Sequence, residues 1–348
     1  MHYRPSRYGL SAPVAARQQV GAALVVAMLV FALSTALVVA MKSQFNRYFQ
    51  RSANILLAEQ AQAYLRGAEE LAAKALVLDY DQDKEEQQAR DDLNEIWASQ
   101  QQPFALDDGG WLSGSLEDLQ GRFNLNHLAV PANKGTGQPR FTAAQEQFIR
   151  LLQALEEPPV SEYEAISITQ AVSDWLDADS IPQPEGAEDD YYYGRTPAHR
   201  AANRPMASVS ELRAVANMTP EIYQALLPWV TVWPQEPKLL NIHTAPGMLL
   251  RSINDEKNLS PLSKSDGESL VQYREENGFE DVEDLIKHPA FGGRGDNMGG
   301  IKGLLDQNSS YFLLRAEVEV AERNMRLYSV LHRSNRQVEA LVRASGSL

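Results

Sequence analysis

The sequence predicts an α+β fold: a long N-terminal helix, a small antiparallel-sheet head and a large all-α domain inserted into that head. Three observations predict it: an uncharged N-terminal run, alternating residues near both ends of the head, and helix-like segments between them. The run, residues 21–41, contains no charged residue. As a helix rising about 1.5 Å per residue, it is long enough to cross a hydrocarbon core of roughly 30 Å.

The helical pattern continues beyond the apolar run. Phe45, Tyr48, Phe49 and Leu56 keep near-helical spacing, and no proline interrupts the chain between the run and Pro103. We therefore expect one helix over residues 22–78, about 85 Å long, whose outer half is amphipathic and packs against the head. The acidic, glutamine-rich residues 79–90 are expected to form a solvated face or turn, and residues 91–99 a short helix.

Strands are predicted on both sides of the helical block. Polar and apolar residues roughly alternate over 111–126, and they alternate strictly from Glu317 to Val320. We expect two adjacent strands within 311–333, joined by a turn near 322–324. The glycine-rich residues 292–303 are expected to form a flexible return loop, and the Arg-Gly-Asp triplet within it is attributed to chance.

The central block resembles SAM-like or helix-hairpin-helix domains. Its expected helices cover 142–155, 166–176, 208–215, 220–227, 245–253, 268–276 and 282–287. The predicted organisation is a leader at 1–21, a transmembrane helix part at 22–42, the head with its helix continuation and first strands at 43–128, the inserted α-helical domain at 129–305 with an acidic loop at 174–190, and the C-terminal strands of the head at 306–348.

The composition excludes several kinds of chemistry. The 348 residues include 32 Lys and Arg, 46 Asp and Glu, and no cysteine, for a formal net charge of −14. The absence of cysteine removes disulfides, thiolate metal sites and cysteine nucleophiles. The negative field disfavours nucleic-acid binding. Because the sequence also lacks paired histidines and known nucleophile or nucleotide motifs, we expect no enzyme and no catalytic residue.

The N-terminal flank predicts the membrane topology. Arg4, Arg7 and Arg17 precede the apolar run and no acidic residue does, so the leader is expected to stay cytoplasmic while the rest is exported. Gly21 lies at the border between the leader and the run, where a peptidase on the cytoplasmic side could cut. A basic leader, a junction glycine, an apolar helix and a head are typical of pilin-like subunits.

The sequence resembles the type II secretion minor pseudopilin K family over nearly its whole length. The resemblance rests on four stretches: Gly21 to Leu24, GWLSGSLEDLQGRFNLNHL (110–128), DWLDADSIPQPEGAEDDYY (174–192) and LNIHTAP (240–246). It implies cleavage after Gly21 by a prepilin peptidase and methylation of Ala22. It also implies a bacterial inner-membrane location, with the C-terminal domain in the periplasm.

The resemblance further implies a place at the pseudopilus tip. Most pilin-like subunits carry Glu as the fifth residue after the cleaved Gly, but here that residue is Val26. An unpaired carboxylate in a membrane is costly, so its absence suits a subunit with no neighbour above it. The implied partners are pseudopilins of the I, J and H types, the prepilin peptidase, exoproteins and the outer-membrane secretin.

The acidic loop is a candidate metal site. Asp174, Asp177, Asp179, Glu188 and Asp189 lie in one loop broken by proline and glycine, and their mutual repulsion must be relieved by solvent, protonation or a cation. On an EF-hand template starting at Asp177, Asp179 and Glu188 fall at positions 3 and 12, but Ile181 and Pro182 break the template. A solvated acidic loop is the alternative. The family resemblance implies structural Ca²⁺.

The sequence leaves two other functions as alternatives. Residues 208–232 and 240–291 resemble helix-hairpin-helix units, so a membrane-tethered DNA-uptake protein is one alternative. The first hairpin turn, Ala216 to Thr219, lacks the glycines that would present N–H groups to phosphate, and the block is acidic. A minor type IV pilin, which shares the anchor, is the other alternative.

Overall fold

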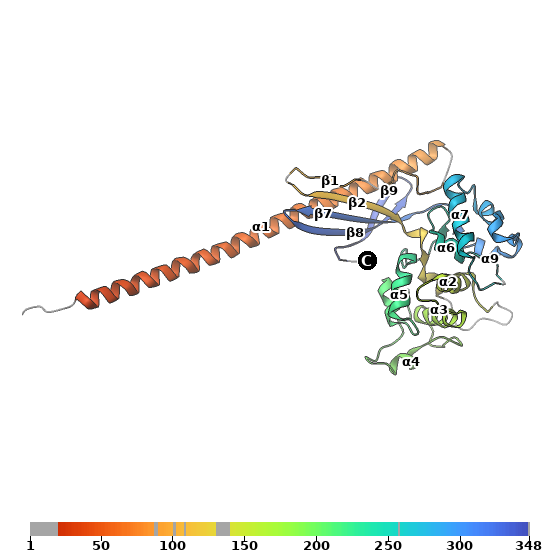
Figure 1. The fold of residues 1–348 in the computed structure, drawn as a ribbon, viewed down its shortest axis with the longest axis horizontal. Coiled ribbons are helices and arrows are strands. Elements are labelled where there is room, and N and C mark those ends of the chain that lie inside the picture. Colours follow the sequence, from red (N-terminus) through yellow and green to blue (C-terminus); the bar gives the residue numbers. More distant parts are fainter. Residues whose placement is uncertain are drawn as a thin grey trace, which may run out of the picture. The chain divides into compact units, whose positions relative to one another are not determined.

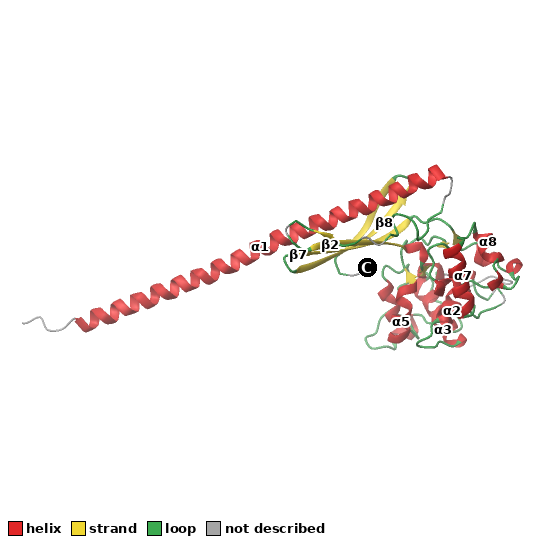
Figure 2. Cartoon of the chain, turned by 45° about the horizontal axis from the view of Figure 1, so that its top comes forward, coloured by secondary structure: helices red, strands yellow, loops and turns green. Residues whose placement is uncertain are grey.

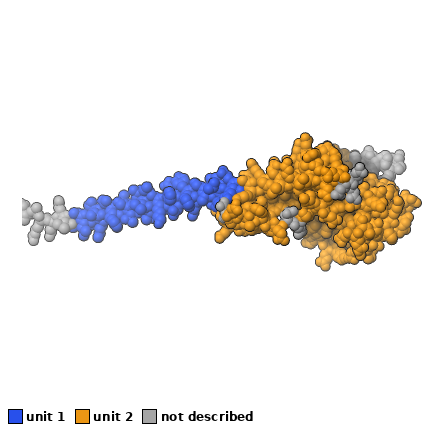
Figure 3. All heavy atoms as spheres, turned by 90° about the horizontal axis from the view of Figure 1, so that it is seen from above, with its two compact units in different colours: residues 1–60 blue, residues 61–348 orange. Residues whose placement is uncertain are grey.

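The chain divides into two compact units, Met1–Gln60 and Ala61–Leu348 (Figure 3). The structure is a computed structural model, and the part of the chain it describes comprises residues 20–86, 90–99, 102–107, 109–129, 140–256 and 258–346. Most of the expected leader, including Arg4, Arg7 and Arg17, lies outside these residues.

Helix α1 (Val20–Glu86) is one uninterrupted helix of 67 residues. In the first unit, every residue from Gly21 to Gln50 is exposed. The expected continuous helix is confirmed, but it ends later than expected. The interpretation of 79–90 as a solvated face or turn is wrong for Asp79, which is buried beside Arg333, and α1 continues to Glu86. Residues 81–85 are half-buried or exposed, as a solvated face requires, and residues 87–89 lie outside the described part of the chain.

The sheet of the second unit is antiparallel, with the order β1-β2-β7-β8-β9. All eight residues of β2 pair with β7, although about 190 residues separate the two strands in sequence. The last part of α1 lies along this sheet (Figures 1 and 2). The strands are β1 (Phe104–Ala105), β2 (Trp111–Asp118), β7 (Tyr311–Val320), β8 (Arg323–Ser334) and β9 (Gln337–Ala344).

The two strands expected within 311–333 are confirmed as β7 and β8. The turn between them uses Ala321 and Glu322, both in the left-handed region with φ of 49° and 64°. The strands expected within 111–126 are β2 and the two-residue strand Phe123–Asn124. Asp118 ends β2 because its side chain accepts a hydrogen bond from Gln120 N and caps a 3₁₀ turn.

Helices fill the insertion between β2 and β7 (Figure 2). They enclose one large apolar core that includes Phe148, Leu151, Ile168 and Leu250. The helices are α2 (Ala143–Ala154), α3 (Glu162–Leu176), α4 (Asp189–Tyr193), α5 (Pro220–Leu226), α6 (Gly247–Ser252), α7 (Lys264–Glu276), α8 (Val282–Lys287) and α9 (Gly299–Lys302); short parallel pairs join β3 (Phe123–Asn124) to β4 (Val230–Thr231) and β5 (Leu240–Asn241) to β6 (Leu305–Asp306).

Local sequence explains several helix starts. Thr142 with Gln145 and Ser161 with Glu164 form capping boxes at α2 and α3, which satisfy N–H groups that a helix start leaves unpaired.

The expected helix at 208–215 is instead a 3₁₀ helix over Val209–Ala214.

Two further expectations are wrong. Residues 91–99 form turns and not a helix. The glycine-rich stretch 292–303 is not a flexible loop, since it contains a 3₁₀ turn and α9 and is held by buried Met298 and Ile301.

Candidate metal centre and membrane anchor

Three acidic side chains converge where α3 ends and α4 begins. Asp177 follows the last residue of α3, Asp179 lies in the next turn, and Glu188 precedes α4. Asp177 Oδ1 accepts a hydrogen bond from Asp179 N at 3.1 Å, and Asp179 Oδ1 accepts one from Ile181 N at 2.8 Å. These bonds fold the turn so that one carboxylate oxygen from each of the three residues lies within 4.8 Å of the others.

Several of these oxygens are buried without a partner. Asp177 Oδ2 and both carboxylate oxygens of Glu188 have no hydrogen-bond partner among the described residues. Asp177 is 5% exposed and Glu188 is 4% exposed. Buried anionic oxygens without donors are costly. Oxygen ligands in flexible geometry are the set that Ca²⁺ prefers, so the residues fit a bound calcium ion.

The acidic site holds its protons unusually tightly. Burial, together with the nearby charges of Asp174 and Asp177, raises the pKa of Glu188 to about 7. Burial likewise raises the pKa of Asp174 to about 7 and that of Asp177 to about 6. The fold thus brings together carboxylates whose simultaneous ionisation is unfavourable. A bound divalent cation would offset their negative charge and make the ionised forms favourable.

Asp174 and Asp189 lie outside this group of three. Both oxygens of the Asp174 carboxylate accept a hydrogen bond from Gln183 N, at 3.2 Å for Oδ1 and 3.1 Å for Oδ2. This contact ties the middle of the loop to the end of α3. A Cβ at position 186 would collide with the Asp174 carboxylate, so Gly186 is required there. Asp189 Oδ1 accepts from Ala201 N at 3.0 Å and faces the following segment.

Asn203 is a neighbouring residue that the sequence did not indicate. Its amide Nδ2 donates to the Asp179 carbonyl at 2.9 Å, while its buried Oδ1 has no hydrogen-bond partner among the described residues. Asn203 adopts φ of 46°. Because it is 24 residues beyond Asp179, no local spacing could have revealed this contact.

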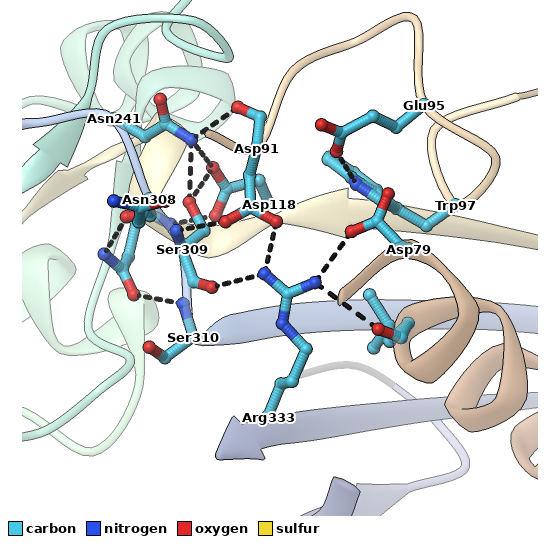
Figure 4. A network of polar contacts seen from close by, with 12 residues as sticks. Asp79, Asp91, Glu95, Trp97, Asp118, Asn241, Asn308, Ser309, Ser310 and Arg333 are labelled. Atoms are coloured by element: carbon cyan, nitrogen blue, oxygen red, sulfur yellow. Dashed lines mark hydrogen bonds and ion pairs between the residues drawn. The ribbon is translucent and has the colours of Figure 1, made fainter. Parts of the chain in front are cut away.

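A second acidic group surrounds Arg333 in the sheet (Figure 4). The buried Arg333 guanidinium donates from Nη1 to Asp79 Oδ2 at 2.7 Å and from Nη2 to Asp91 Oδ1. The Ser309 backbone N–H donates to Asp91 Oδ2 at 2.7 Å. Since a guanidinium and a backbone N–H already satisfy these carboxylates, this group calls for no metal ion.

Glu95 and Asp118 complete this network (Figure 4). Burial, together with the charge of Asp79, raises the pKa of Glu95 to about 9. Asp118 Oδ2 accepts from Ser309 Oγ at 2.6 Å and from Asn241 Nδ2 at 3.3 Å. The network therefore joins α1, β8 and the entry and exit of the inserted domain through buried polar groups.

The expected processing and tip residues lie at the start of α1. Gly21, Ala22 and Val26 are helical and exposed. In the described part of the chain, one helix is long and apolar enough to span a membrane, with a mean hydropathy of 2.7 in its most apolar window and none of that window buried. This helix fits a single-pass membrane anchor.

An apolar N-terminal helix followed by a head with an antiparallel sheet is the architecture of a pilin-like subunit. Models of the family described as "Type II secretion system (T2SS), protein K" match residues 121–235 and 240–302. The type II secretion system protein K of Aeromonas hydrophila is 33% identical, covering 91% of this chain and 94% of that protein. The type II secretion system protein K of Pseudomonas aeruginosa is 35% identical, and the match covers 91% of this chain and 90% of that protein.

A solved structure shares the fold. It matches with a TM-score of 0.72 and 29% identity, over 86% of this chain and 100% of that one, and is described as the GspK-GspI-GspJ complex from the enterotoxigenic Escherichia coli type 2 secretion system. The chain belongs to the type II secretion system protein K family, and its role is that of a minor pseudopilin. These matches do not favour the DNA-uptake alternative.

Proposed function

We propose that this minor pseudopilin forms the tip of the type II secretion pseudopilus together with other minor pseudopilins. In that position it initiates or caps the filament that drives folded exoproteins across the outer membrane. The observation that carries the proposal is the helical insertion between two neighbouring strands, β2 and β7. An added body of that size on the head is compatible with the end of a filament, where no further head must stack.

The partners are other minor pseudopilins. The related solved chain was determined in a complex with GspI and GspJ, which supports subunits of the I and J types as partners here. An H-type subunit, the prepilin peptidase, exoproteins and the secretin are further proposed contacts. The role requires binding and positioning, with no catalysis by this chain.

The anchor is proposed to lie in the bacterial inner membrane with the head in the periplasm. A prepilin peptidase cleaves after Gly21, and Ala22 becomes the methylated N-terminus. The uncharged run and the arginines that precede it support this orientation. Because Val26 stands where most pilin-like subunits have Glu, this chain has no carboxylate at that point in the membrane. It therefore needs no pairing with the N-terminus of a neighbouring subunit.

A structural Ca²⁺ is proposed for the acidic loop. Asp177, Asp179 and Glu188 would hold the ion, and Asn203 Oδ1 is an additional candidate oxygen. The ion supplies positive charge that offsets the buried carboxylates. Asp174, through Gln183, and Asp189, through Ala201, fix the loop on either side. The rigid loop then presents a defined surface to partners.

Secretion in the source bacterium tests this function. Deletion of the chain should abolish release of folded exoproteins into the medium, and plasmid-borne wild-type chain should restore it. A variant with Gly21→Phe, which blocks the proposed cleavage, should remain in the membrane at its precursor mass and fail to restore release. Full release without the chain would contradict the proposed role.

A further inference from the structure

A concave pocket lies at the turn of the first helical hairpin. It has a volume of about 740 Å³ and is formed by the end of α4, the segment after it, and the turn before α5. Its lining includes Tyr191, Arg195, Thr196, His199, Arg213 and Asn217. None of these residues belongs to the acidic group proposed to bind calcium.

Two arginines on this pocket, Arg195 and Arg213, have no acidic partner among the residues that the structure describes. In the described part of the chain, neither Arg195 nor Arg213 has a carboxylate within 4.0 Å, whereas the nearby Arg204 pairs with Glu211 at 3.4 Å. This is unexpected because acidic residues outnumber basic ones by 46 to 32. An arginine in so acidic a chain would be expected to find an internal carboxylate.

Both guanidinium groups are held over aromatic rings. Arg195 lies 4.5 Å from the centroid of the Tyr191 ring, and Arg213 lies 6.0 Å from that of Tyr223. Such cation–π contacts orient a guanidinium while leaving its N–H donors available. The pocket therefore has two oriented cationic groups, and Tyr191 and Tyr192 supply its aromatic wall.

His199 and the hairpin turn complete the lining of the pocket. His199 Nδ1 lies 3.0 Å from the Pro197 carbonyl oxygen, while Nε2 has no partner among the described residues. Asn217 adopts φ of 64° at the hairpin turn. The adjacent Ala216 N–H donates to the Tyr192 hydroxyl at 3.2 Å, which fixes this turn against α4.

We propose that this pocket binds a carboxylate side chain of an acidic segment on a partner protein. A planar guanidinium can donate two parallel hydrogen bonds to one carboxylate, and two of them can clasp neighbouring acidic side chains. The aromatic wall suits an apolar residue beside the acid. A nucleic acid is disfavoured because the hairpin turn, Ala216 to Thr219, lacks the glycines that would present backbone N–H groups to phosphate. This proposal does not depend on the proposed function.

Binding of a defined peptide tests the pocket. The probe is Gly-Glu-Leu-Glu-Tyr-Gly amide carrying a neutral dye, and its control has Gln in place of both Glu. Fluorescence anisotropy is measured with the full chain in detergent, at constant calcium. The Glu peptide should bind and the Gln peptide should bind at least about tenfold more weakly. Added salt should weaken the binding of the Glu peptide.

Matched variants assign the binding to the pocket. Arg195→Gln and Arg213→Gln should each lower the affinity for the Glu peptide about tenfold. Arg204→Gln, which removes the same charge outside the pocket, should leave that affinity unchanged. Circular dichroism checks that each variant is folded. Equal binding of the two peptides, equal effects of all three variants, or displacement by inorganic phosphate but not by acetate would each overturn the proposal.

Discussion

Glu188 is the side chain whose replacement most directly tests the metal centre, because both its carboxylate oxygens are buried without a partner. Calcium at about one hundred times its dissociation constant should stabilise the wild-type chain by about 2.7 kcal/mol relative to excess chelator. Glu188→Gln should lose most of that gain. The measurement is the thermal midpoint of the full chain in detergent, with and without calcium.

Asp190→Asn is the matched control for that experiment. Asp190 belongs to the same loop and is exposed, and its replacement removes the same charge. Its calcium-dependent rise in thermal midpoint should match that of the wild type. A wild-type midpoint that is identical in calcium and in chelator would remove the calcium proposal.

Asp118 should make stability depend on pH. Burial raises its pKa from 3.8 to about 6, so the folded state keeps the proton at pH values where the unfolded chain has lost it. The folded state is therefore penalised progressively as pH rises from about 4 to about 6, by about 3 kcal/mol in total. Asp118→Asn should lack this component of the urea-unfolding free energy.

The comparison of wild type and Asp118→Asn isolates this group, since all other titrating carboxylates are common to both chains. The wild type should lose stability relative to the variant between pH 4 and pH 6. A difference that is constant over this interval would show that Asp118 does not titrate as proposed.

Individual residues differ in how far the sequence predicts them. Asp177, Asp179 and Glu188 could be proposed because they crowd one short loop, where like charges must be relieved. Asn203 and Arg333 could not, because their partners are far away in sequence and only the tertiary fold brings them together.

At the scale of elements, Arg333 holds the last turns of α1 against β8. Arg333→Met would leave Asp79 and Asp91 buried without their counter-charge, which typically costs about 3–5 kcal/mol. The variant should unfold at a much lower urea concentration than the wild type. Arg336→Met is the control, because Arg336 pairs with Asp81 at 3.2 Å but is largely exposed. It should change stability by less than about 1 kcal/mol.

A comparable loss in both variants would contradict a special role for the buried pair. An Arg333→Met variant as stable as the wild type would also contradict it, because Asp79 and Asp91 would then have to be neutral or solvated.

Elements defined by local periodicity were the predictable ones. Helix α1 and the β7–β8 hairpin follow from apolar spacing and from the strict alternation of Glu317 to Val320. The sequence predicts an earlier end of α1 because its last turns are acidic, and the burial of Asp79 among them depends on its pairing with the distant Arg333. The pairing of β2 with β7 could not be predicted, because no local pattern specifies a register between such distant strands.

At the scale of the whole molecule, Val26 tests the position in the filament. Val26→Glu places a carboxylate in the apolar run, and at a tip no neighbouring N-terminus would pair with it. Exoprotein release in the complemented deletion strain should fall severalfold, while Val26→Ile should support normal release. Undiminished release with Val26→Glu would argue against a tip position.

The most direct test of the tip assignment is the composition of the complex. The full chain would be purified in detergent together with the I-type and J-type pseudopilins of the same bacterium, and its mass determined by light scattering corrected for bound detergent. A stable species with one copy of each subunit is the predicted result. A chain that stays monomeric beside well-folded I and J subunits would contradict the account.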